Sequence, residues 1–420
     1  MEFSFLPFIV SFSGLYMLFK LRFFFILHPK KCLGKLFSEI KKTDSRRALC
    51  LALAGTLGVG NIFGVGAGLI VGGAGSLFWL IFSAVFSMAI KYSEATLSQE
   101  MKRGGRGGMQ YVIEGLYPRA GKFLGVIYAV LCLCLSLFMG AGVQSAALAD
   151  TLFSSFAFFR GGCALILSLL LVISVMRGDR QIERITEFLI PLVAVIYFSM
   201  AGSVIVLNSN RLTEVLSRVL SEAFKIRSAV GGGLSFLLSR AFREGFARGI
   251  LSNEAGIGTS AMALSRINEK EPSTAGLLGV LEVFFDTAVL CPLTALAILL
   301  SVGDPSVYKT PMSLVCSAFE GALGRSSLYI LAFCVGVFAF STIVCWYYYG
   351  SECCFYLFGR NRPLLFTFAF VFSVFLGCFS NSFSLIFVTD TAIFLMALIT
   401  IFTILKHNKR ITLLTSDFLG

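Results

Sequence analysis

Long apolar stretches separated by short polar segments run along almost the whole chain. Crossing the hydrocarbon core of a bilayer takes about 17–25 apolar residues in a helix. Eleven stretches meet that length, and together they predict an all-α polytopic membrane protein with 11 transmembrane helices. The predicted spans are residues 4–26, 48–71, 76–97, 123–148, 160–176, 187–207, 233–263, 274–302, 326–358, 363–379 and 384–405.

Two of these spans contain stretches that do not favour a continuous helix. Ala54–Gly68 holds six glycines and the polar Asn61, and Gly249–Ser260 combines glycines with Ser252, Asn253 and Glu254. Glycine in a helix interior costs about 1 kcal/mol relative to alanine. Irregular backbone survives in hydrocarbon only where it is buried in protein or lines a cavity. Paired interruptions in the two halves of a chain predict a transport site near the bilayer midplane.

The position of the two interrupted spans predicts an internal repeat. Setting aside the first helix leaves ten spans, and each group of five begins with an interrupted one. An odd number of spans inserts the second group upside-down, which is the LeuT-type inverted repeat. The predicted units are an N-terminal helix with its basic loop, a first repeat, a connection, a second repeat and a tail, at residues 1–47, 48–207, 208–232, 233–405 and 406–420.

Basic residues gather on one side of this arrangement. Alternate loops, beginning with residues 27–47, hold 22 Lys and Arg residues, whereas the loops on the other side hold six. Cytoplasmic loops carry the excess of Lys and Arg. We therefore expect a plasma (inner) membrane protein with the N-terminus outside and the C-terminus in the cytoplasm. The formal charge of +12 is then a topology signal, and nucleic acid is not an expected partner.

Composition supports a membrane carrier and argues against an enzyme. Charged residues make up 14% of the chain, against about 25% in soluble domains. Most of the 12 cysteines lie in apolar runs, where free cysteine behaves as a small hydrophobic residue. With only two histidines, no cluster has catalytic or metal-binding spacing. We expect no cofactor and no enzymatic activity.

The interruptions supply the candidate chemistry. Carbonyls freed by a broken helix suit Na⁺, and amides freed at the start of the next half-helix suit a carboxylate. The glycines Gly60, Gly64 and Gly68 also fit an alternative, in which GxxxG steps simply allow close helix packing.

Buried charges are the second group of candidates. Glu254 near mid-depth costs about 2.5–3.5 kcal/mol on insertion scales, so we expect either a salt bridge to Arg243 or Arg248 or a role with an ion or proton. Glu282 and Asp286 are four residues apart on one helix face, where like charges repel and a bound cation or proton is favoured. Lys91 and Glu94, three apart, are expected to form a local pair.

Five sequence blocks resemble the alanine or glycine:cation symporter family of sodium-coupled amino acid carriers. They are GVGNIFGVGAGLIVGGAGSLFW, RGGMQYVIEGL, GAGVQSAALAD, FREGFARGILSNEAGIGTSAMA and FAFSTIVCWYYYGSE, and they extend over about residues 48–405. They are similar to the family blocks GTGN followed by GGPGA-x-F-W, GGPAYYI, VQA-N, RGLFSNEAG and FAFTTI followed by YYYGE.

The resemblance implies where substrate and ion bind. Substrate contacts from the two interrupted helices and their neighbours are implied for Gly58, Gly60, Asn61, Gln144, Leu251, Ser252, Asn253 and Trp346. A Na⁺ cage of carbonyls and hydroxyls is implied near Thr56, Val59, Ser341 and Thr342. Alternatives remain: an interhelical hydrogen bond for Gln144, ordinary core packing for Trp346, and bonding to the i−4 carbonyl for Ser341 and Thr342.

Two departures from the family blocks concern these positions. The family's GTGN reads GVGN here, so Val59 lacks a hydroxyl, and its FSNEAG reads LSNEAG, so Leu251 replaces an aromatic wall. Both changes point to a selectivity or a coupling that differs from that of typical members.

The sequence therefore predicts a secondary transporter that imports a small neutral amino acid, alanine or glycine, by symport with Na⁺. The partners are the amino acid, Na⁺ and the lipid bilayer. One alternative is a proton-coupled carrier that uses Glu254 or Asp286. A channel and a polytopic membrane enzyme have less support, because neither pore-lining charged rings nor catalytic clusters are evident.

Overall fold

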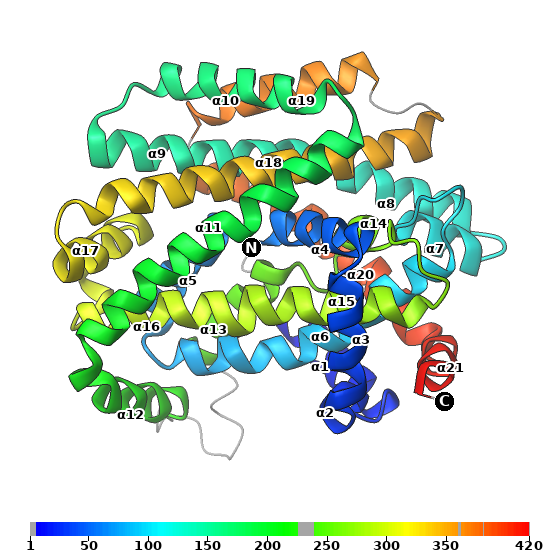
Figure 1. Ribbon diagram of the computed structural model, residues 1–420, viewed down its shortest axis with the longest axis horizontal. Helices are drawn as coiled ribbons and strands as arrows, with labels where there is room; N and C mark the ends of the chain where they lie inside the picture. Colours follow the sequence, from blue (N-terminus) through cyan, green and yellow to red (C-terminus); the bar gives the residue numbers. More distant parts are fainter. Residues whose placement is uncertain (1–5, 226–238, 360–362, 381, 420) are drawn as a thin grey trace.

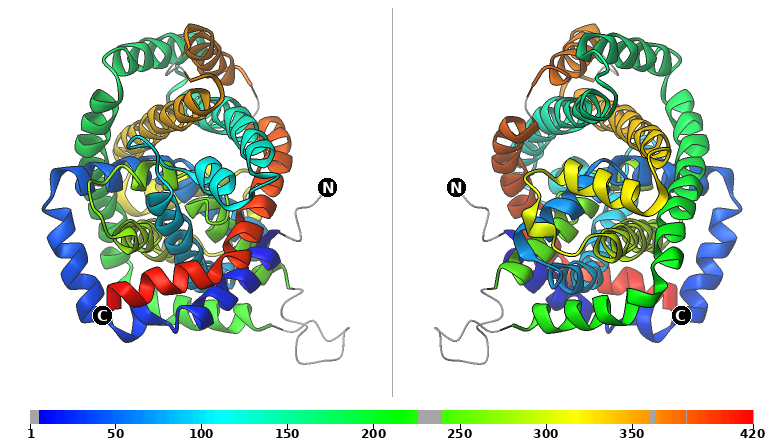
Figure 2. Two further views of the ribbon diagram at one scale, coloured as in Figure 1. Left: turned by 90° about the vertical axis from the view of Figure 1, so that its right-hand side faces the viewer. Right: turned by 90° about the vertical axis from the view of Figure 1, so that its left-hand side faces the viewer.

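The computed structural model describes residues 6–225, 239–359, 363–380 and 382–419. Helices make up nearly all of the regular structure in these ranges, and the single β-bridge joins Arg103 to Arg106. Figure 1 shows long helices crossing the molecule, and Figure 2 shows it end-on, with α11 in green on one rim and α20 in orange-red on the other.

The first interrupted span is broken as predicted. It consists of α4 (Thr43–Thr56), the wide π-helical turn η1 (Gly60–Gly64) and α5 (Val65–Gly72), with a bend of 51° between the two halves. At the break, the amide of Gly58 turns to the Thr56 carbonyl at 2.9 Å. The amide of Val59 faces the Gln144 side chain instead of the preceding helix turn. The carbonyls of Ala54 and Gly55 thereby lose their i+4 donors.

The second interrupted span is broken more widely. Helix α13 (Arg240–Asn253) ends where Glu254 adopts a left-handed backbone with φ 56°, and only a short turn, α14 (Ala261–Leu264), follows. Gly256 and Gly258 between them have φ values of +91° and +81°, which glycine adopts without the steric penalty of a Cβ. Part of the predicted span 233–263 lies outside the described residues.

Most other predicted spans are helices near their expected positions. Within the described ranges, six helices are long and apolar enough to cross a membrane, and the bent pair α4–α5 makes a seventh. Helices α1, α10 and α19 are apolar but have only 15, 16 and 14 residues, so the count of 11 spans stays a prediction. The predicted span 326–358 contains one unbroken helix of 32 residues, Ser327–Phe358.

The bounds of these helices are α1 (Leu6–Lys20), α6 (Ser76–Glu100), α8 (Gly121–Leu135), η2 (Ser136–Val143), α9 (Gln144–Phe156), α10 (Arg160–Val175), α11 (Asp179–Leu207), α15 (Pro272–Val283), η5 (Phe284–Leu290), α16 (Cys291–Ser301), α18 (Ser327–Phe358), α19 (Leu364–Gly377) and α20 (Ser382–Lys406). The segments α8–η2–α9 and α15–η5–α16 are each one span with a π-helical middle.

Six short helices occupy segments that the apolar pattern assigns to loops or span ends. They are α2 (Phe24–Leu27), α3 (Pro29–Ile40), α7 (Met109–Leu116), α12 (Leu212–Ala223), α17 (Pro311–Leu323) and α21 (Asn408–Leu419), joined by the 3₁₀ turns η3 (Ser209–Arg211) and η6 (Pro305–Val307). In α12, the buried Val215, Val219 and Ala223 recur every four residues, which is the signature of an amphipathic helix lying on a surface.

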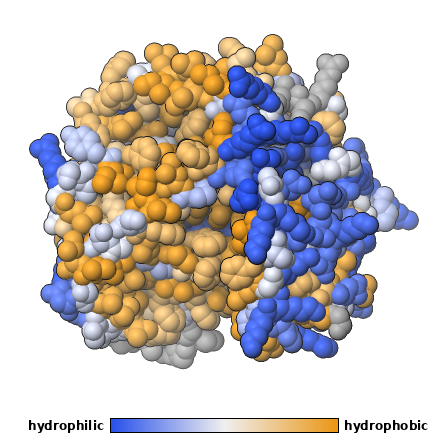
Figure 3. Space-filling view, in the orientation of Figure 1, coloured by the Kyte–Doolittle hydropathy of each residue, from blue (hydrophilic) through white to orange (hydrophobic). Residues whose placement is uncertain are grey.

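The surface divides into an apolar and a polar part. Apolar residues cover most of the face in Figure 3, whereas hydrophilic residues gather on the side that carries α7 and α21. Large apolar side chains are exposed on the outer helices, among them Phe12, Leu165, Phe188 and Phe368. Apolar patches of this extent are absent from soluble monomers, so we assign this face to lipid.

Helices α13 and α15 each pack closely against α6 at a glycine, where there is no room for a larger side chain. A Cβ added to Gly249 of α13 would collide with Ser83 Oγ of α6, and one added to Gly276 of α15 would collide with Thr96 Oγ1 of α6. Small residues allow helix axes to approach this closely in membranes. The three helices therefore form one interlocked unit, the α6–α13–α15 unit.

Ion pairs attach both broken helices to α11 at the ends that the basic loops predict to be cytoplasmic. Glu187 of α11 accepts from Arg46 Nε and Arg47 Nε of α4, each at 2.8 Å. Arg266, just after α14, lies 2.7 Å from Glu183 Oε1 of the same helix. One helix thus holds both half-helices in place at the side that the positive-inside rule assigns to the cytoplasm.

The first prediction concerns the contact between α4 and α11. Glu187→Gln removes the charge shared by the two arginines, so we expect α4 to separate from α11 more often. The buried Cys50 of α4 should then react severalfold faster with a maleimide, measured by mass spectrometry of the labelled peptide. Glu114→Gln, which breaks the more exposed Arg103–Glu114 pair, is the control. Equal labelling of Cys50 in both variants would contradict this role.

Candidate binding site between the two broken helices

A hydrogen-bonded cluster joins the two breaks to a third helix. Asn61 Nδ2, in η1, donates to Asp286 Oδ1 at 2.5 Å and to Ser252 Oγ at 3.0 Å. Ser252, near the end of α13, donates to Asp286 Oδ2 at 2.8 Å. All three side chains are buried. Two predicted substrate contacts and one predicted ion-coupling carboxylate therefore meet at one point.

The backbone departs from regular α-helix at two members of this cluster. Asn61 lies in η1 and Asp286 in η5, both π-helical turns, and a third such turn, η2, directly precedes Gln144. Single π-helical turns inside α-helices occur frequently at functional sites. The Asn61 Oδ1 atom also accepts from the Gly58 amide at 3.0 Å, so its orientation is fixed from both ends.

Asn253 closes the end of its own helix. Its Nδ2 donates to the Gly249 carbonyl at 2.7 Å and to Thr287 Oγ1 at 2.9 Å. Its Oδ1 accepts from the Ala255 amide at 3.0 Å. These bonds use both donors and one lone pair of the amide, so Asn253 shapes the break from within.

Two helices from opposite halves of the chain contact the first break. Gln144 Oε1 of α9 accepts from the Val59 amide at 3.4 Å, and Thr342 Oγ1 of α18 donates to the Leu57 carbonyl at 3.4 Å. A Cβ added to Gly58 would lie 3.0 Å from Thr342 Oγ1 and 3.2 Å from Gln144 Oε1. A side chain at position 58 would therefore crowd both neighbours.

The other predicted Na⁺ ligands bond within their own helices. Thr56 Oγ1 donates to the Ala52 carbonyl at 3.4 Å, and Ser341 Oγ donates to the Phe338 carbonyl at 3.0 Å. The Val59 carbonyl accepts from the Phe63 amide at 2.8 Å. Thr342 alone among these four brings its hydroxyl to the break. The carbonyl that it meets belongs to Leu57, which the sequence reasoning did not single out.

The remaining predicted substrate contacts differ in their exposure to solvent. Gly60 is exposed, with nothing within 4 Å of an added Cβ, and Leu251 is half-buried. Both therefore border accessible space beside the breaks. Trp346 is fully buried, and its ring packs edge-on against Tyr349 with centroids 5.6 Å apart. It also lies against Gly140 of η2, so its contacts are those of helix packing.

Several charged side chains lie next to the second break. Two of their ion pairs differ from those that the sequence predicts. Lys91 Nζ lies 3.3 Å from Glu282 Oε1 of α15, so its ion pair crosses between helices instead of joining Glu94. Arg248 pairs with Glu244 one turn away at 3.3 Å, so it is not the partner of Glu254. Glu254 instead accepts a hydrogen bond from Thr259.

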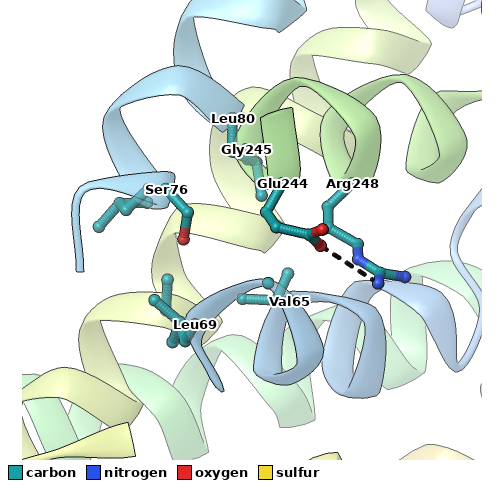
Figure 4. Close-up of a pocket in the computed structure, with 10 residues that line it drawn as sticks. Val65, Leu69, Ser76, Leu80, Glu244, Gly245 and Arg248 are labelled. Carbon is teal, nitrogen blue, oxygen red and sulfur yellow. Dashed lines mark hydrogen bonds and ion pairs between the residues drawn. The ribbon is translucent and has the colours of Figure 1, made fainter. Parts of the chain in front are cut away.

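A narrow recess, without room for a water molecule, lies between the half-helices α5 and α13 and the start of α6. Figure 4 shows the Glu244 and Arg248 side chains meeting at its edge. The recess lies apart from the Asn61 cluster, because its lining includes none of the predicted substrate contacts. The lining residues are Val65, Gly68, Leu69, Ser76, Leu77, Leu80, Glu244, Gly245, Arg248 and Ala295.

Comparison with known proteins places this site in context. The protein named sodium/alanine symporter AgcS of Methanococcus maripaludis is 30% identical over 79% of this chain and 74% of its own length. The putative sodium/proton-dependent alanine carrier YrbD of Bacillus subtilis is 32% identical over 81% of this chain and 73% of its own length. Among solved structures, MhsT in complex with L-phenylalanine has a TM-score of 0.62 and 17% identity, covering 84% of this chain and 86% of its own.

The comparisons confirm several predictions. The likeness to MhsT shows the fold, and the predicted all-α LeuT-type class is correct. The two relatives are named as a symporter and a carrier, and the described chain has several helices able to cross a membrane. The chain is therefore a multi-pass membrane transporter and not an enzyme. The profile of the sodium:alanine symporter family matches residues 2–419, and the chain belongs to this family.

Proposed function

We propose that the chain imports a small neutral amino acid, with alanine or glycine as the first candidates, by symport with Na⁺ across the plasma membrane. The observation that carries this proposal is the cluster of Asn61, Ser252 and Asp286, which joins both broken helices to η5. A ligand bound there contacts every element that must move in alternating access. No organic cofactor enters the proposal, because ion gradients supply the driving force.

The Asp286 cluster is the first proposed Na⁺ site. Na⁺ prefers hard oxygen ligands, and here a buried carboxylate lies beside the Ser252 hydroxyl. An uncompensated charge in the bundle interior is costly, so a bound cation stabilises ionised Asp286. The substrate carboxylate would lie nearby, where Gly60 is exposed at the positive start of the η1–α5 half-helix.

The first break supports a second Na⁺ site. Thr342 Oγ1 and the Leu57 carbonyl meet there at 3.4 Å. The carbonyls of Ala54 and Gly55 lack their helical donors in the same turn. Hydroxyl and carbonyl oxygens together form the kind of neutral cage that Na⁺ occupies at broken helices.

The surroundings of Gly60 favour a small, neutral side chain on the substrate. Gly60 and Leu251 border the open space. Asp286 is the carboxylate bonded to the Asn61–Ser252 pair, which the Cys291 thiol also contacts. With the Asp286 carboxylate compensated by Na⁺, the described residues of this cluster offer no counter-charge to a charged substrate side chain.

Alternating access would use the contacts at the two ends of the broken helices. In the state described, α11 holds the cytoplasmic ends through Arg46, Arg47 and Arg266. The narrow recess between α5 and α13 (Figure 4) lies among the half-helices on the other side of the breaks, which the proposed topology assigns to the extracytoplasmic side. Na⁺ and substrate favour the same closed state, so each raises the affinity of the other.

A proton-driven version of the same carrier is the second candidate. The buried Glu254 in the second break favours it, and the name of the YrbD relative includes both sodium and proton dependence. The two versions differ in whether uptake survives the removal of Na⁺.

The second prediction tests Na⁺ coupling. In proteoliposomes at fixed pH, replacing Na⁺ with choline should abolish uptake of labelled alanine. Thr342→Val should weaken apparent Na⁺ affinity at least tenfold, because a polar contact to a charged group contributes roughly 1.5–3 kcal/mol. Thr294→Val, a buried threonine bonded to Tyr197, is the matched control and should leave Na⁺ affinity unchanged. Undiminished uptake in choline would exclude Na⁺ symport.

The third prediction tests the close approach at Gly58. Gly58→Ala places a methyl group 3.0 Å from Thr342 Oγ1, so Thr342 and Gln144 must shift. We expect at least a tenfold loss of alanine affinity in the presence of Na⁺, measured by isothermal titration of purified protein. Gly64→Ala has open space around the new Cβ and should bind as the unmodified chain does. Equal affinity of the two variants would refute the proposed contact.

A further inference from the structure

Three buried glutamates share one buried lysine beneath the second break. Lys91 and Glu94 lie on α6, Glu254 lies in the break and Glu282 lies on α15. Each residue is at most 2% exposed. If all four side chains were ionised, two negative charges would stay uncompensated in a dry part of the bundle.

Lys91 forms its hydrogen bonds with residues other than Glu94. Its Nζ donates to Ser260 Oγ at 2.6 Å and to Glu282 Oε1 at 3.3 Å. Glu282 therefore takes the compensating charge. Ser260 begins the turn that leads into α14, so Lys91 also holds the far side of the break.

Glu94 is bonded on one oxygen only. Its Oε1 accepts from the Gly256 amide at 2.7 Å. Its Oε2 is buried and has no hydrogen-bond partner among the described residues. A half-satisfied carboxylate in the interior is costly, whereas the neutral acid keeps the bond to Gly256 and removes the charge.

The groups around Glu94 come from every element packed against it. Lys91 lies one turn before it on α6, Glu254 faces it from the break and Glu282 faces it from α15. On α8, Tyr128 donates its hydroxyl to the Ile257 carbonyl at 2.8 Å. No group of three or more acidic, histidine or cysteine side chains in the described part of the chain could hold a metal ion. A proton on Oε2, which has no other partner among the described residues, would neutralise Glu94 in this position.

We propose that Glu94 is a proton-binding site whose proton leaves when Na⁺ binds at Asp286. Asp286 lies one helical turn beyond Glu282 in the same span, so Na⁺ there adds positive charge close to the glutamates. That charge favours ionised Glu94, and the O–H bond at Oε2 breaks with release of H⁺ to water. Glu94 bonds to Gly256 and not to the proposed Na⁺ ligands.

This inference rests on the proposed Na⁺ coupling and adds an exchange to it. One H⁺ leaves as one Na⁺ enters, so the charge of the buried cluster stays constant through the binding step. Because Glu94 bonds to the Gly256 amide and Lys91 to Ser260, the exchange is located at the break that must rearrange during transport.

The fourth prediction is proton release on Na⁺ binding. Purified protein in weakly buffered detergent solution is mixed with NaCl and alanine, or with choline chloride and alanine, and a pH-sensitive dye is read. We expect release of up to about one H⁺ per chain in the NaCl sample and none in the choline chloride sample. Apparent Na⁺ affinity should rise with pH by up to about tenfold per pH unit, the limit for one linked proton.

Glu94→Gln is the test variant, because its side-chain carbonyl can still accept from Gly256. It should bind alanine in a Na⁺-dependent manner but release no proton, and its Na⁺ affinity should not vary with pH. Glu352→Gln is the matched control, since Glu352 is equally buried but has its own arginine, Arg106. It should release protons as the unmodified chain does.

The pH window from about 6 to about 8 suits this measurement. The hydrogen bond from Lys42, in the cytoplasmic loop, lowers the pKa of Glu269 to about 2, so that pair does not titrate there. Na⁺-dependent alanine binding without proton release, or equal release from the Glu94→Gln variant, would overturn the inference. Absence of Na⁺-dependent binding in the unmodified chain would refute the proposed function itself, and this inference with it.

Discussion

Every backbone amide and carbonyl in the apolar interior must find a partner, and this requirement organises the whole molecule. Each break in a helix frees such groups, and side chains of other helices bond to several of them. Gln144 and Thr342 bond to the first break, and Glu94 and Tyr128 bond to the second. The unpaired backbone groups at the breaks therefore help to position the four helices that carry these side chains, α9, α18, α6 and α8. The same openings that demand partners also offer places for ions and substrate.

Much of this arrangement is evident in local sequence. Glycine and polar residues within an apolar run identify a break wherever it occurs, so the two interruptions and most helix positions followed from the sequence. The partners of buried charges did not. A spacing of three residues placed Lys91 beside Glu94, but the structure gives Lys91 to Glu282 on another helix. The choice depends on which helices are neighbours, and local spacing holds no information about that.

Backbone ligands and surface helices were the other features that the sequence left hidden. The carbonyl of Leu57 meets Thr342, yet any residue can present a carbonyl, so the side chain gives no sign of it. Helices such as α12 and α21 are 12 residues long and carry apolar residues on one face and polar residues on the other. Their average hydropathy is that of a loop, and a search for long apolar runs passes over them. Helical periodicity is the signal that would have found them.

The interlocked α6–α13–α15 unit has a mechanical consequence. Helices that approach this closely at Gly249 and Gly276 resist sliding past one another, so we expect the unit to move as one body. We then expect bending in the second half of the chain between residues 254 and 260, next to a short helix of four residues, Ala261–Leu264. At 1.5 Å per residue, this helix is about 6 Å long. A short helix attached to a rigid unit moves over a small distance and returns to the same position, which suits a gate that closes after every transport cycle.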